Sequence, residues 1–320
     1  MMISQEISQA NWRIELQNFL DSKPKKPLLV VLGPTASGKT DFSISLAKTL
    51  SKDFQKSVEI LNADSRQLYK FLDIGTAKIT KEEMRGVPHH LLDVLDPKEE
   101  CTIAWYQKEA TKIIDDVHVR GGVPMLVGGS MLYLSAMIDG LKPIDSDPVI
   151  RARLSSEYDR DAGVTLHKRL IAVDPESAAL IPRENKVYVL RALEIFETTG
   201  IPKSKQRRTS NCPYDLLIFG IEIDRAVLRK RIQQRTEKML ASGWIDEVRS
   251  LLARGYTAND PAMKSHGYLE IVEFLEGQEG KKAGGQEVDL AEKISSHVRK
   301  YAKRQRTWWK GDERIRWIKI

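Results

Sequence analysis

The sequence predicts an α/β fold in which a parallel sheet is flanked by helices and carries a mainly α-helical insertion domain. Short apolar runs alternate with segments of helical periodicity along most of the 320 residues, which is typical of parallel sheets. An early apolar run is followed by the glycine-rich stretch Gly33–Thr40 and then by a helical segment. The block 142–208 is helical in pattern and lies between two apolar runs. Together these features predict a phosphate-loop NTPase-like sheet with an inserted helical domain.

Gly33–Thr40 reads GPTASGKT and fits the phosphate-loop pattern G-x-x-x-x-G-K-[ST]. The run Leu28–Leu32 precedes it as a buried strand and Asp41–Leu50 follows as a helix, which is the order that the motif requires. Loop amides, the helix N-terminus and Lys39 would bind a di- or triphosphate, with Mg²⁺ on the Thr40 hydroxyl. Gly33 and Gly38 could instead be ordinary turn glycines, but that alternative does not explain Lys39 directly before Thr40 at the start of a helix. The predicted phosphate-binding residues are Gly33, Pro34, Thr35, Ala36, Ser37, Gly38, Lys39 and Thr40.

Polar residues follow two further predicted strands at their carboxyl ends, where ligands bind in parallel α/β sheets. The strand around Val58–Leu61 leads to Asp64, and the strand Val123–Val127 leads to Ser130. We therefore expect Asp64 and Ser130 to face the phosphate loop. Asp64 could be a Mg²⁺ ligand, a general base or a helix N-cap, and the shared cleft with the nearby Arg66 favours chemistry. Ser130 could also be only the N-cap of the next helix. The strand before Ser130 does not end in the acidic residue that holds Mg²⁺ in phosphate-loop ATPases, which counts against ordinary ATP hydrolysis.

Two basic segments lie in the second half of the chain. Residues 225–253 have the pattern of one long helix, with Arg231 and Arg235 four residues apart on one face. Such arginines can neutralise a diphosphate leaving group, although a solvated charged face is the alternative. Residues 295–310 combine basic and aromatic side chains without an acid. This combination suits an RNA backbone and its unstacked bases; a membrane surface would require a broader apolar face.

The predicted domains are a core of residues 1–141 and 209–320, which includes the basic C-terminal region, and an insertion domain of residues 142–208 that offers a second recognition surface. The net charge of +7 and the pI near 9.2 mildly indicate a polyanionic partner. Cys101 and Cys212 fit neither a zinc spacing nor a disulfide framework, which favours a reducing cytoplasm. No apolar run approaches the ~20 residues of a membrane span. We therefore expect a cytoplasmic monomer with no membrane partner.

Several sequence blocks occur together along nearly the whole chain. Besides GPTASGKT, these are NADSRQ at 62–67, DIGTAK at 73–78, PHHLLDVLDP at 88–97 and LVGGSMLY at 126–133. RALE at 191–194, RIQQR at 231–235 and YAKRQ at 301–305 follow. Each block alone would be modestly specific. In this combination the chain resembles the bacterial tRNA dimethylallyltransferases.

The resemblance implies transfer of a dimethylallyl group from dimethylallyl diphosphate to the exocyclic 6-amino group of the tRNA adenosine just 3′ of the anticodon. The products would be N6-isopentenyladenosine and diphosphate. The phosphate loop and Arg231 would hold the diphosphate, with Mg²⁺ at Thr40. The implied catalytic residues are Asp64 as the base, Thr35 at the bridging oxygen or the base, and Arg235 on the developing charge. The adenosine must leave its stack to reach the cleft.

The resemblance also implies tRNA contacts in five parts of the chain, 64–67, 130, 151, 187–191 and 265–270. Leu269 stands where the family usually has a basic residue, and Val187–Leu190 stands where basic residues are often seen. His266 replaces an apolar residue, so it is either a core histidine or a new RNA contact. The implied tRNA-binding residues are Asp64, Ser65, Arg66, Gln67, Ser130, Arg151, Val187, Tyr188, Val189, Leu190, Arg191, Ser265, His266, Gly267, Tyr268, Leu269 and Glu270.

Three rival functions can be set beside this one. An adenylate isopentenyltransferase would keep the donor site but would need neither the basic tail nor the large insertion. A phosphate-loop small-molecule kinase would share the loop and the arginines and would bind ATP. A non-catalytic RNA-binding protein with a vestigial loop is the third rival, and the intact Lys39, Thr40 and Asp64 argue against it.

Overall fold

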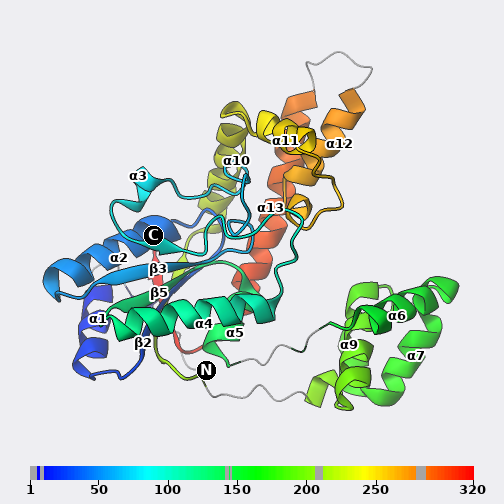
Figure 1. Cartoon of the computed structure of the whole chain (residues 1–320), viewed down its shortest axis with the longest axis horizontal. Coiled ribbons are helices and arrows are strands. Elements are labelled where there is room, and N and C mark those ends of the chain that lie inside the picture. Colours follow the sequence, from blue (N-terminus) through cyan, green and yellow to red (C-terminus); the bar gives the residue numbers. More distant parts are fainter. Residues whose placement is uncertain (1–5, 8–10, 141–143, 145, 206–211, 279–285) are drawn as a thin grey trace. The chain divides into compact units, whose positions relative to one another are not determined.

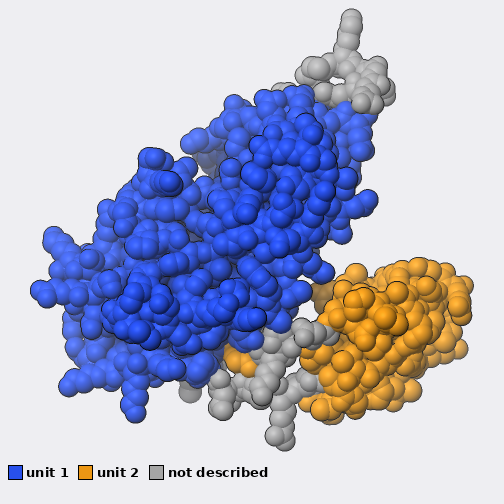
Figure 2. Space-filling model, viewed as in Figure 1, with its two compact units in different colours: residues 1–138, 212–320 blue, residues 139–211 orange. Residues whose placement is uncertain are grey.

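The structure, a computed structural model, describes residues 6–7, 11–140, 144, 146–205, 212–278 and 286–320. The chain divides into two compact units, one of residues 1–138 and 212–320 and one of residues 139–211 (Figure 2). The boundaries that we predicted from the sequence, after residues 141 and 208, lie three residues from these.

The larger unit is built on a parallel sheet, which confirms the predicted α/β class. Within the described residues seven strands pair in the order β1-β7-β6-β2-β5-β3-β4, all of them parallel. We did not predict β1, β4 and β7 from the sequence. The strands β1 and β4 are only two residues long, and β7 comes after the basic C-terminal helix. The strands are β1 (Glu6–Ile7), β2 (Pro27–Leu32), β3 (Val58–Ala63), β4 (His89–His90), β5 (Val123–Gly128), β6 (Asp215–Glu222) and β7 (Ile315–Lys319).

Helices cover both faces of this sheet (Figure 1). The helices of the larger unit are α1 (Trp12–Asp21), α2 (Lys39–Asp53), α3 (Lys81–Met84), α4 (Ile103–Val119), α5 (Met131–Ile138), α10 (Arg225–Ala241), α11 (Trp244–Ala253), α12 (Tyr268–Gln278) and α13 (Gln286–Trp309). Alternate residues of β2 point to opposite faces, as strand geometry dictates. Leu29 and Val31 pack with α1 and α2, whereas Leu28, Val30 and Leu32 pack with α4 and α5.

The strand register brings the carboxyl ends of the central strands to one level. Leu32 of β2 pairs with Gly128 of β5 on one side and with Gly220 of β6 on the other. Gly128 also pairs with Ala63, the last residue of β3. The loops after β2, β3 and β5 therefore begin side by side, which places the phosphate loop, Asp64 and Ser130 at one edge of the sheet.

The prediction of one helix over residues 225–253 is wrong. Helix α10 ends at Ala241 and α11 begins at Trp244, because Gly243 adopts the left-handed conformation with φ +95° and turns the chain. Asp224 begins α10 as its N-cap and accepts the backbone N–H groups of Ala226 and Val227. The buried side chains of α10 meet α13 in a small cluster that includes Ile232.

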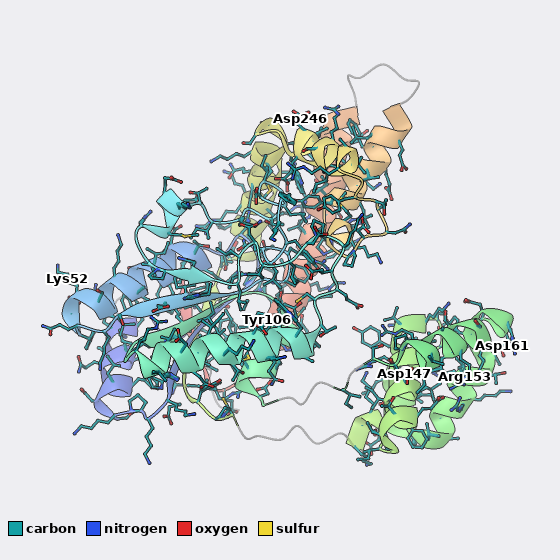
Figure 3. The ribbon with its side chains drawn as sticks, viewed as in Figure 1. Lys52, Tyr106, Asp147, Arg153, Asp161 and Asp246 are labelled. Atoms are coloured by element: carbon teal, nitrogen blue, oxygen red, sulfur yellow. The ribbon has the colours of Figure 1, made fainter. Side chains whose placement is uncertain are left out.

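The smaller unit is helical, with its own core. Its helices are α6 (Pro148–Asp161), α7 (Val164–Val173), α8 (Pro175–Leu180) and α9 (Lys186–Thr199). Asp147 begins α6 as an N-cap, and Arg153 of α6 pairs with Glu157 at 2.8 Å and also with Glu197 of α9 (Figure 3). Leu166 and Val189 are fully buried in the core of this unit. Of the helices that the structure describes in either unit, none is long and apolar enough to cross a membrane.

Candidate active site

The phosphate loop connects β2 to α2 in the predicted way. Gly38 precedes α2 with φ +92°, a conformation that favours glycine. A Cβ on Gly33 would lie 3.1 Å from the Ile221 carbonyl of β6, so the loop passes tightly over the neighbouring strand. Because the first N–H groups of an α-helix lack intrahelical partners, the start of α2 presents donors to an anion. Ser37 adds a buried hydroxyl oxygen that has no hydrogen-bond partner among the described residues.

Lys39 is the first residue of α2, directly after Gly38 of the loop. Its Nζ donates a hydrogen bond to the Pro34 carbonyl at 2.7 Å. Burial lowers the pKa of Lys39 to about 8, against the opposing effect of the negative charge on Asp64 and with the help of the positive charge on Arg235. An anion at this place would compensate for the lost hydration of the ammonium and raise its pKa again.

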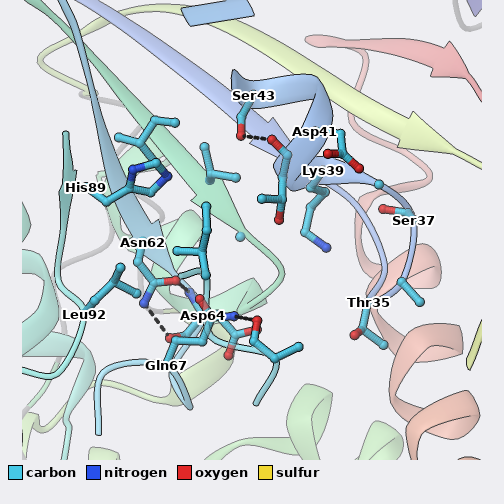
Figure 4. Close-up of a pocket in the computed structure, with 18 of the residues that line it drawn as sticks. Thr35, Ser37, Lys39, Asp41, Ser43, Asn62, Asp64, Gln67, His89 and Leu92 are labelled. Carbon is cyan, nitrogen blue, oxygen red and sulfur yellow. Dashed lines mark hydrogen bonds between the residues drawn. The ribbon is translucent and has the colours of Figure 1, made fainter. Parts of the chain in front are cut away.

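A first cavity of about 400 Å³ opens over the loop (Figure 4). Figure 4 shows Lys39 and Thr35 on one side of it, with Asn62, Asp64 and Gln67 on the other. Apolar side chains, among them Ile79, Leu92 and Val127, also line it. The residues that line it include Thr35, Ala36, Ser37, Gly38, Lys39, Thr40, Asn62, Asp64, Gln67, Ile79, His89, Leu92, Val127, Arg231 and Arg235.

Asp64 is held by the end of β3 and is not a helix N-cap, because a turn and not a helix follows it. The side-chain amide of Asn62 accepts the Asp64 N–H and donates to the Asp64 carbonyl, both at 2.9 Å. Tyr106 of α4 donates its hydroxyl to the Asn62 carbonyl at 2.9 Å (Figure 3). The carboxylate Oδ1 of Asp64 accepts the backbone N–H of Arg66 at 3.0 Å. One carboxylate oxygen is thus engaged, and the side chain lines the cavity.

A second cavity of about 330 Å³ shares Thr35, Ala36, Asp64 and Arg235 with the first. Its other lining residues come from the segment after β3, from α10, α11 and α13 and from the segment before α12, and several are basic or aromatic. They include Arg66, Trp244, Lys264, Ser265, His266, Tyr301 and Arg304. The predicted catalytic residues Thr35, Asp64 and Arg235 therefore line both the cavity over the phosphate loop and the basic, aromatic cavity.

The two arginines of α10 face this region and do not form a solvated face. Arg235 lines both cavities, and burial lowers its pKa while the charge of Asp64 opposes that shift. Arg231 lines the first cavity, and its Nη1 would lie 3.9 Å from a Cβ placed on Gly38. Both side chains can therefore approach an anion that is bound to the loop.

The residues present fit a Mg²⁺–diphosphate group. Thr40 is exposed at the start of α2 and lines the first cavity, next to Asp41. The described residues contain no cluster of three or more histidine, cysteine or acidic side chains that could hold a metal by itself. Mg²⁺ in phosphate sites needs only one or two protein ligands because the phosphates supply others.

Several predicted tRNA contacts in the larger unit instead hold the site together. Ser130 is buried, and its Oγ accepts the Ser65 N–H at 2.8 Å. The side-chain amide of Gln67 donates to the carbonyls of Thr76 and Ala77, both at 3.1 Å. Arg66 donates to the Pro261 carbonyl at 3.2 Å and still lines the second cavity.

The predicted tRNA-binding residues 265–270 differ in how far their side chains are buried. Tyr268 is fully buried and donates its hydroxyl to Glu247 at 2.6 Å, so its side chain offers no surface to RNA. Ser265 and Glu270 are also buried, and a Cβ on Gly267 would lie 2.0 Å from the Trp244 ring. His266 is exposed and lines the second cavity, whereas Leu269 is half-buried.

In the helical unit some of the predicted tRNA-binding residues are buried and others are exposed. Val189 and Leu190 are core residues, so their side chains are removed from the predicted RNA surface. Arg191 donates to Glu194 at 2.8 Å and to the Ile144 carbonyl at 2.5 Å. The remaining predicted residues, Arg151, Val187 and Tyr188, are exposed.

Sequence reasoning missed Asn62, Gln305 and Glu247, which help to build the site, whereas Tyr301 lies in the basic and aromatic segment 295–310 that it singled out. Asn62 orients Asp64, Tyr301 lines the second cavity, and burial raises the pKa of the Tyr301 hydroxyl to about 12. Gln305 bonds to the phosphate loop, and Glu247 binds the loop after Phe71. Asn62 lies in the block NADSRQ and Gln305 in the block YAKRQ. These blocks indicated the two positions but did not indicate what the side chains do.

The chain matches the IPP transferase family model over residues 67–312. It is 42% identical over 300 residues to a tRNA dimethylallyltransferase of Symbiobacterium thermophilum, covering 92% of this chain and 90% of that protein. Its fold superposes on the tRNA isopentenylpyrophosphate transferase of Bacillus halodurans with TM-score 0.65, 38% identity and coverage of 92% and 90%. A eukaryotic dimethylallyltransferase acting on tRNA gives TM-score 0.74 and 26% identity, covering 92% of this chain and 74% of that one. The chain therefore belongs to the IPP transferase family.

Proposed function

We propose that the protein transfers a dimethylallyl group from dimethylallyl diphosphate to the exocyclic amino group of the tRNA adenosine just 3′ of the anticodon. The observation that carries this proposal is the meeting of the two cavities at Thr35, Asp64 and Arg235. One cavity has the donors of a diphosphate site, and the other has the cations and aromatic rings that suit an unstacked nucleotide. The names of the related proteins support the same activity.

In the donor half, the first N–H groups of α2, Lys39 and the two arginines of α10 would bind the diphosphate. The charge on that group grows as the allylic C–O bond breaks, so preformed donors stabilise the transition state more than the ground state. Thr35 would donate to the bridging oxygen or contact the base. Mg²⁺ at Thr40 would supply further charge neutralisation when bound.

In the acceptor half, Asp64 would act as the general base. The amino nitrogen forms a bond to the dimethylallyl C1, the C1–O bond breaks, and diphosphate leaves with the bonding electrons. The proton released from the nitrogen goes to the Asp64 carboxylate, whose Oδ1 keeps its hydrogen bond to Arg66. Tyr301, with its raised pKa of about 12, stays neutral and can donate.

The tRNA surface that we propose is narrower than the one that the sequence implied. In the larger unit it comprises the exposed rim of the second cavity, with Arg66, Lys264, His266 and Arg304. Arg151, Val187 and Tyr188 would contribute from the helical insertion, which we propose as a tRNA-binding domain. We further propose action as a monomer in the cytoplasm, where tRNA is the polyanionic partner of this basic chain.

The test is transfer of label from dimethylallyl diphosphate, with Mg²⁺, to unmodified tRNA or to free AMP in parallel. Label in tRNA alone is the expected result. Label in AMP alone would make the protein an adenylate isopentenyltransferase. Label in neither acceptor, with ATP consumed on a small molecule, would support the kinase instead. A tRNA transcript without the adenosine 3′ of the anticodon is the matched control and should stay unlabelled.

A further inference from the structure

Gln305 joins the C-terminal helix α13 to the phosphate loop. Its side chain is 2% exposed and uses both ends of its amide. Oε1 accepts the backbone N–H of Thr35 at 2.9 Å, and Nε2 donates to the carbonyl of Gly129 at 2.8 Å. One neutral side chain therefore ties the loop after β2 to the loop after β5.

The surroundings of Gln305 fit an amide at this place. A Cβ on Gly129 would lie 2.1 Å from Nε2 of Gln305, so the glycine makes room for the amide. Tyr301, one turn earlier on α13, donates to the same Gly129 carbonyl at 3.4 Å. A carboxylate in place of the amide would set an oxygen against the Gly129 carbonyl in a buried position, which is unfavourable without a donor.

The bond to Gln305 decides how Thr35 can act. Because the Thr35 N–H is already taken, it is not one of the loop donors for the diphosphate. The bond also fixes the backbone from which the Thr35 side chain reaches the junction of both cavities. A small rotation of this peptide would move the side chain away from the reacting bond while leaving the amides of α2 in place.

We propose that Gln305 is a positioning residue, which acts through Thr35 and sets the rate of prenyl transfer more than donor binding. The inference rests on the proposed role of Thr35. A misplacement of about 1 Å can cost roughly a hundredfold in rate. We therefore expect loss in kcat with little change in KM for dimethylallyl diphosphate when the Gln305 amide is lost.

The experiment is a double-mutant cycle in the full chain with Gln305→Leu, Thr35→Val and the pair. Each single change should lower kcat for tRNA prenylation by about 10- to 100-fold. In the Thr35→Val background, Gln305→Leu should cost less than about 3-fold, because residues that act as a unit are not additive. Thr307→Ala, an exposed position on the same helix whose Oγ1 bonds to the Lys303 carbonyl, is the control and should leave kcat unchanged.

Equal cost of Gln305→Leu in both backgrounds would overturn the proposal and leave Gln305 as a packing residue. Full kcat in Thr35→Val would overturn both the role of Thr35 and the positioning role, while prenylation itself would persist. If Gln305→Leu does not fold, Gly129→Ala provides the second test, because its Cβ displaces Nε2. Gly129→Ala should then show the same loss of kcat and the same lack of additivity with Thr35→Val.

Discussion

The negative charge of Asp64 acts on the ammonium of Lys39, and both side chains line the first cavity. Burial lowers the pKa of Lys39 to about 8, and the negative charge of Asp64 prevents a larger shift. The buried Lys39 ammonium therefore loses its proton near pH 8, well below its ordinary pKa of 10.5. The proposed base Asp64 thus affects the charge of Lys39, on which donor binding and stability depend.

The first prediction concerns the pH dependence of donor binding. In the free enzyme Lys39 loses its proton as the pH rises through about 8, and with it the charge that attracts a diphosphate. KM for dimethylallyl diphosphate should rise between about pH 7 and about pH 9.5. Lys39→Arg, which stays charged, should flatten this rise, and Lys48→Ala on the exposed face of α2 should not. A flat KM profile in the unmodified protein would contradict the assignment.

The second prediction concerns stability. The folded pKa of Lys39, about 8, lies below its ordinary value of 10.5, so the unfolded chain binds more protons between these values. Stability from this group should therefore rise with pH across that window and be lowest below about pH 8. Lys39→Met removes the desolvated charge and should raise Tm at about pH 7 while it abolishes donor use. A lower Tm for Lys39→Met at that pH would show that the ammonium stabilises the fold.

The third prediction tests Asp64 as the base. Asp64→Asn keeps an oxygen for the Arg66 N–H but cannot accept the substrate proton. We expect kcat to fall by roughly 10²- to 10⁴-fold, with tRNA affinity largely kept. Single-turnover rates and tRNA binding by filter retention separate the two effects. Severe loss of tRNA binding with an unchanged single-turnover rate would remove Asp64 as the base and make it an RNA contact.

The sequence was sufficient for the features that depend on local order. The phosphate loop follows from strand, glycine loop and helix in immediate succession, and Asp64 follows from its position just after a strand. Parallel pairing then brings Leu32, Ala63 and Gly128 level. The arginines of α10 needed one further assumption, that their face meets the loop, and the structure bears this out.

The parts that the sequence did not give depend on contacts between distant segments. The family resemblance implies Tyr268 as an RNA contact, but its side chain is buried. Its hydroxyl donates to Glu247, and its ring centroid lies 5.6 Å from that of Trp244. The bond between Thr35 and Gln305 joins residues 270 positions apart. A left-handed glycine such as Gly243 divides a helix whose periodicity continues on both sides. Periodicity and motif order carry no signal of such contacts.

The fourth prediction concerns the packing of Trp244. Cβ atoms on Gly75 and Gly267 would lie 2.1 Å and 2.0 Å from its indole, so the ring is enclosed by two glycine backbones. Gly75→Ala and Gly267→Ala should each destabilise the protein by about 1–3 kcal/mol, the usual cost of overpacking a core. Gly277→Ala, in open space on α12, is the matched control and should stabilise by about 1 kcal/mol. Urea unfolding measures all three, and equal effects at the three glycines would contradict this account.

The last prediction concerns the loop after Phe71, in which Gly75 and Thr76 line the second cavity and Ala77 lines the first. The Glu247 carboxylate of α11 accepts the backbone N–H groups of Asp73, Ile74 and Gly75 at 2.9, 2.7 and 3.2 Å. It also accepts the Tyr268 hydroxyl at 2.6 Å. An amide in its place offers one acceptor oxygen and turns a donor toward the loop, so some of these N–H groups lose their partner.

Glu247→Gln should therefore cost about 1–3 kcal/mol in the free energy of unfolding. Hydrogen exchange should become faster at the amides of the 73–75 loop, and remain unchanged at those of β2, because the loop opens locally before the sheet unfolds. Asp246→Asn, the exposed neighbour on the same helix, is the control and should stay within about 0.5 kcal/mol. Unchanged exchange in the loop of Glu247→Gln would show that other contacts hold it.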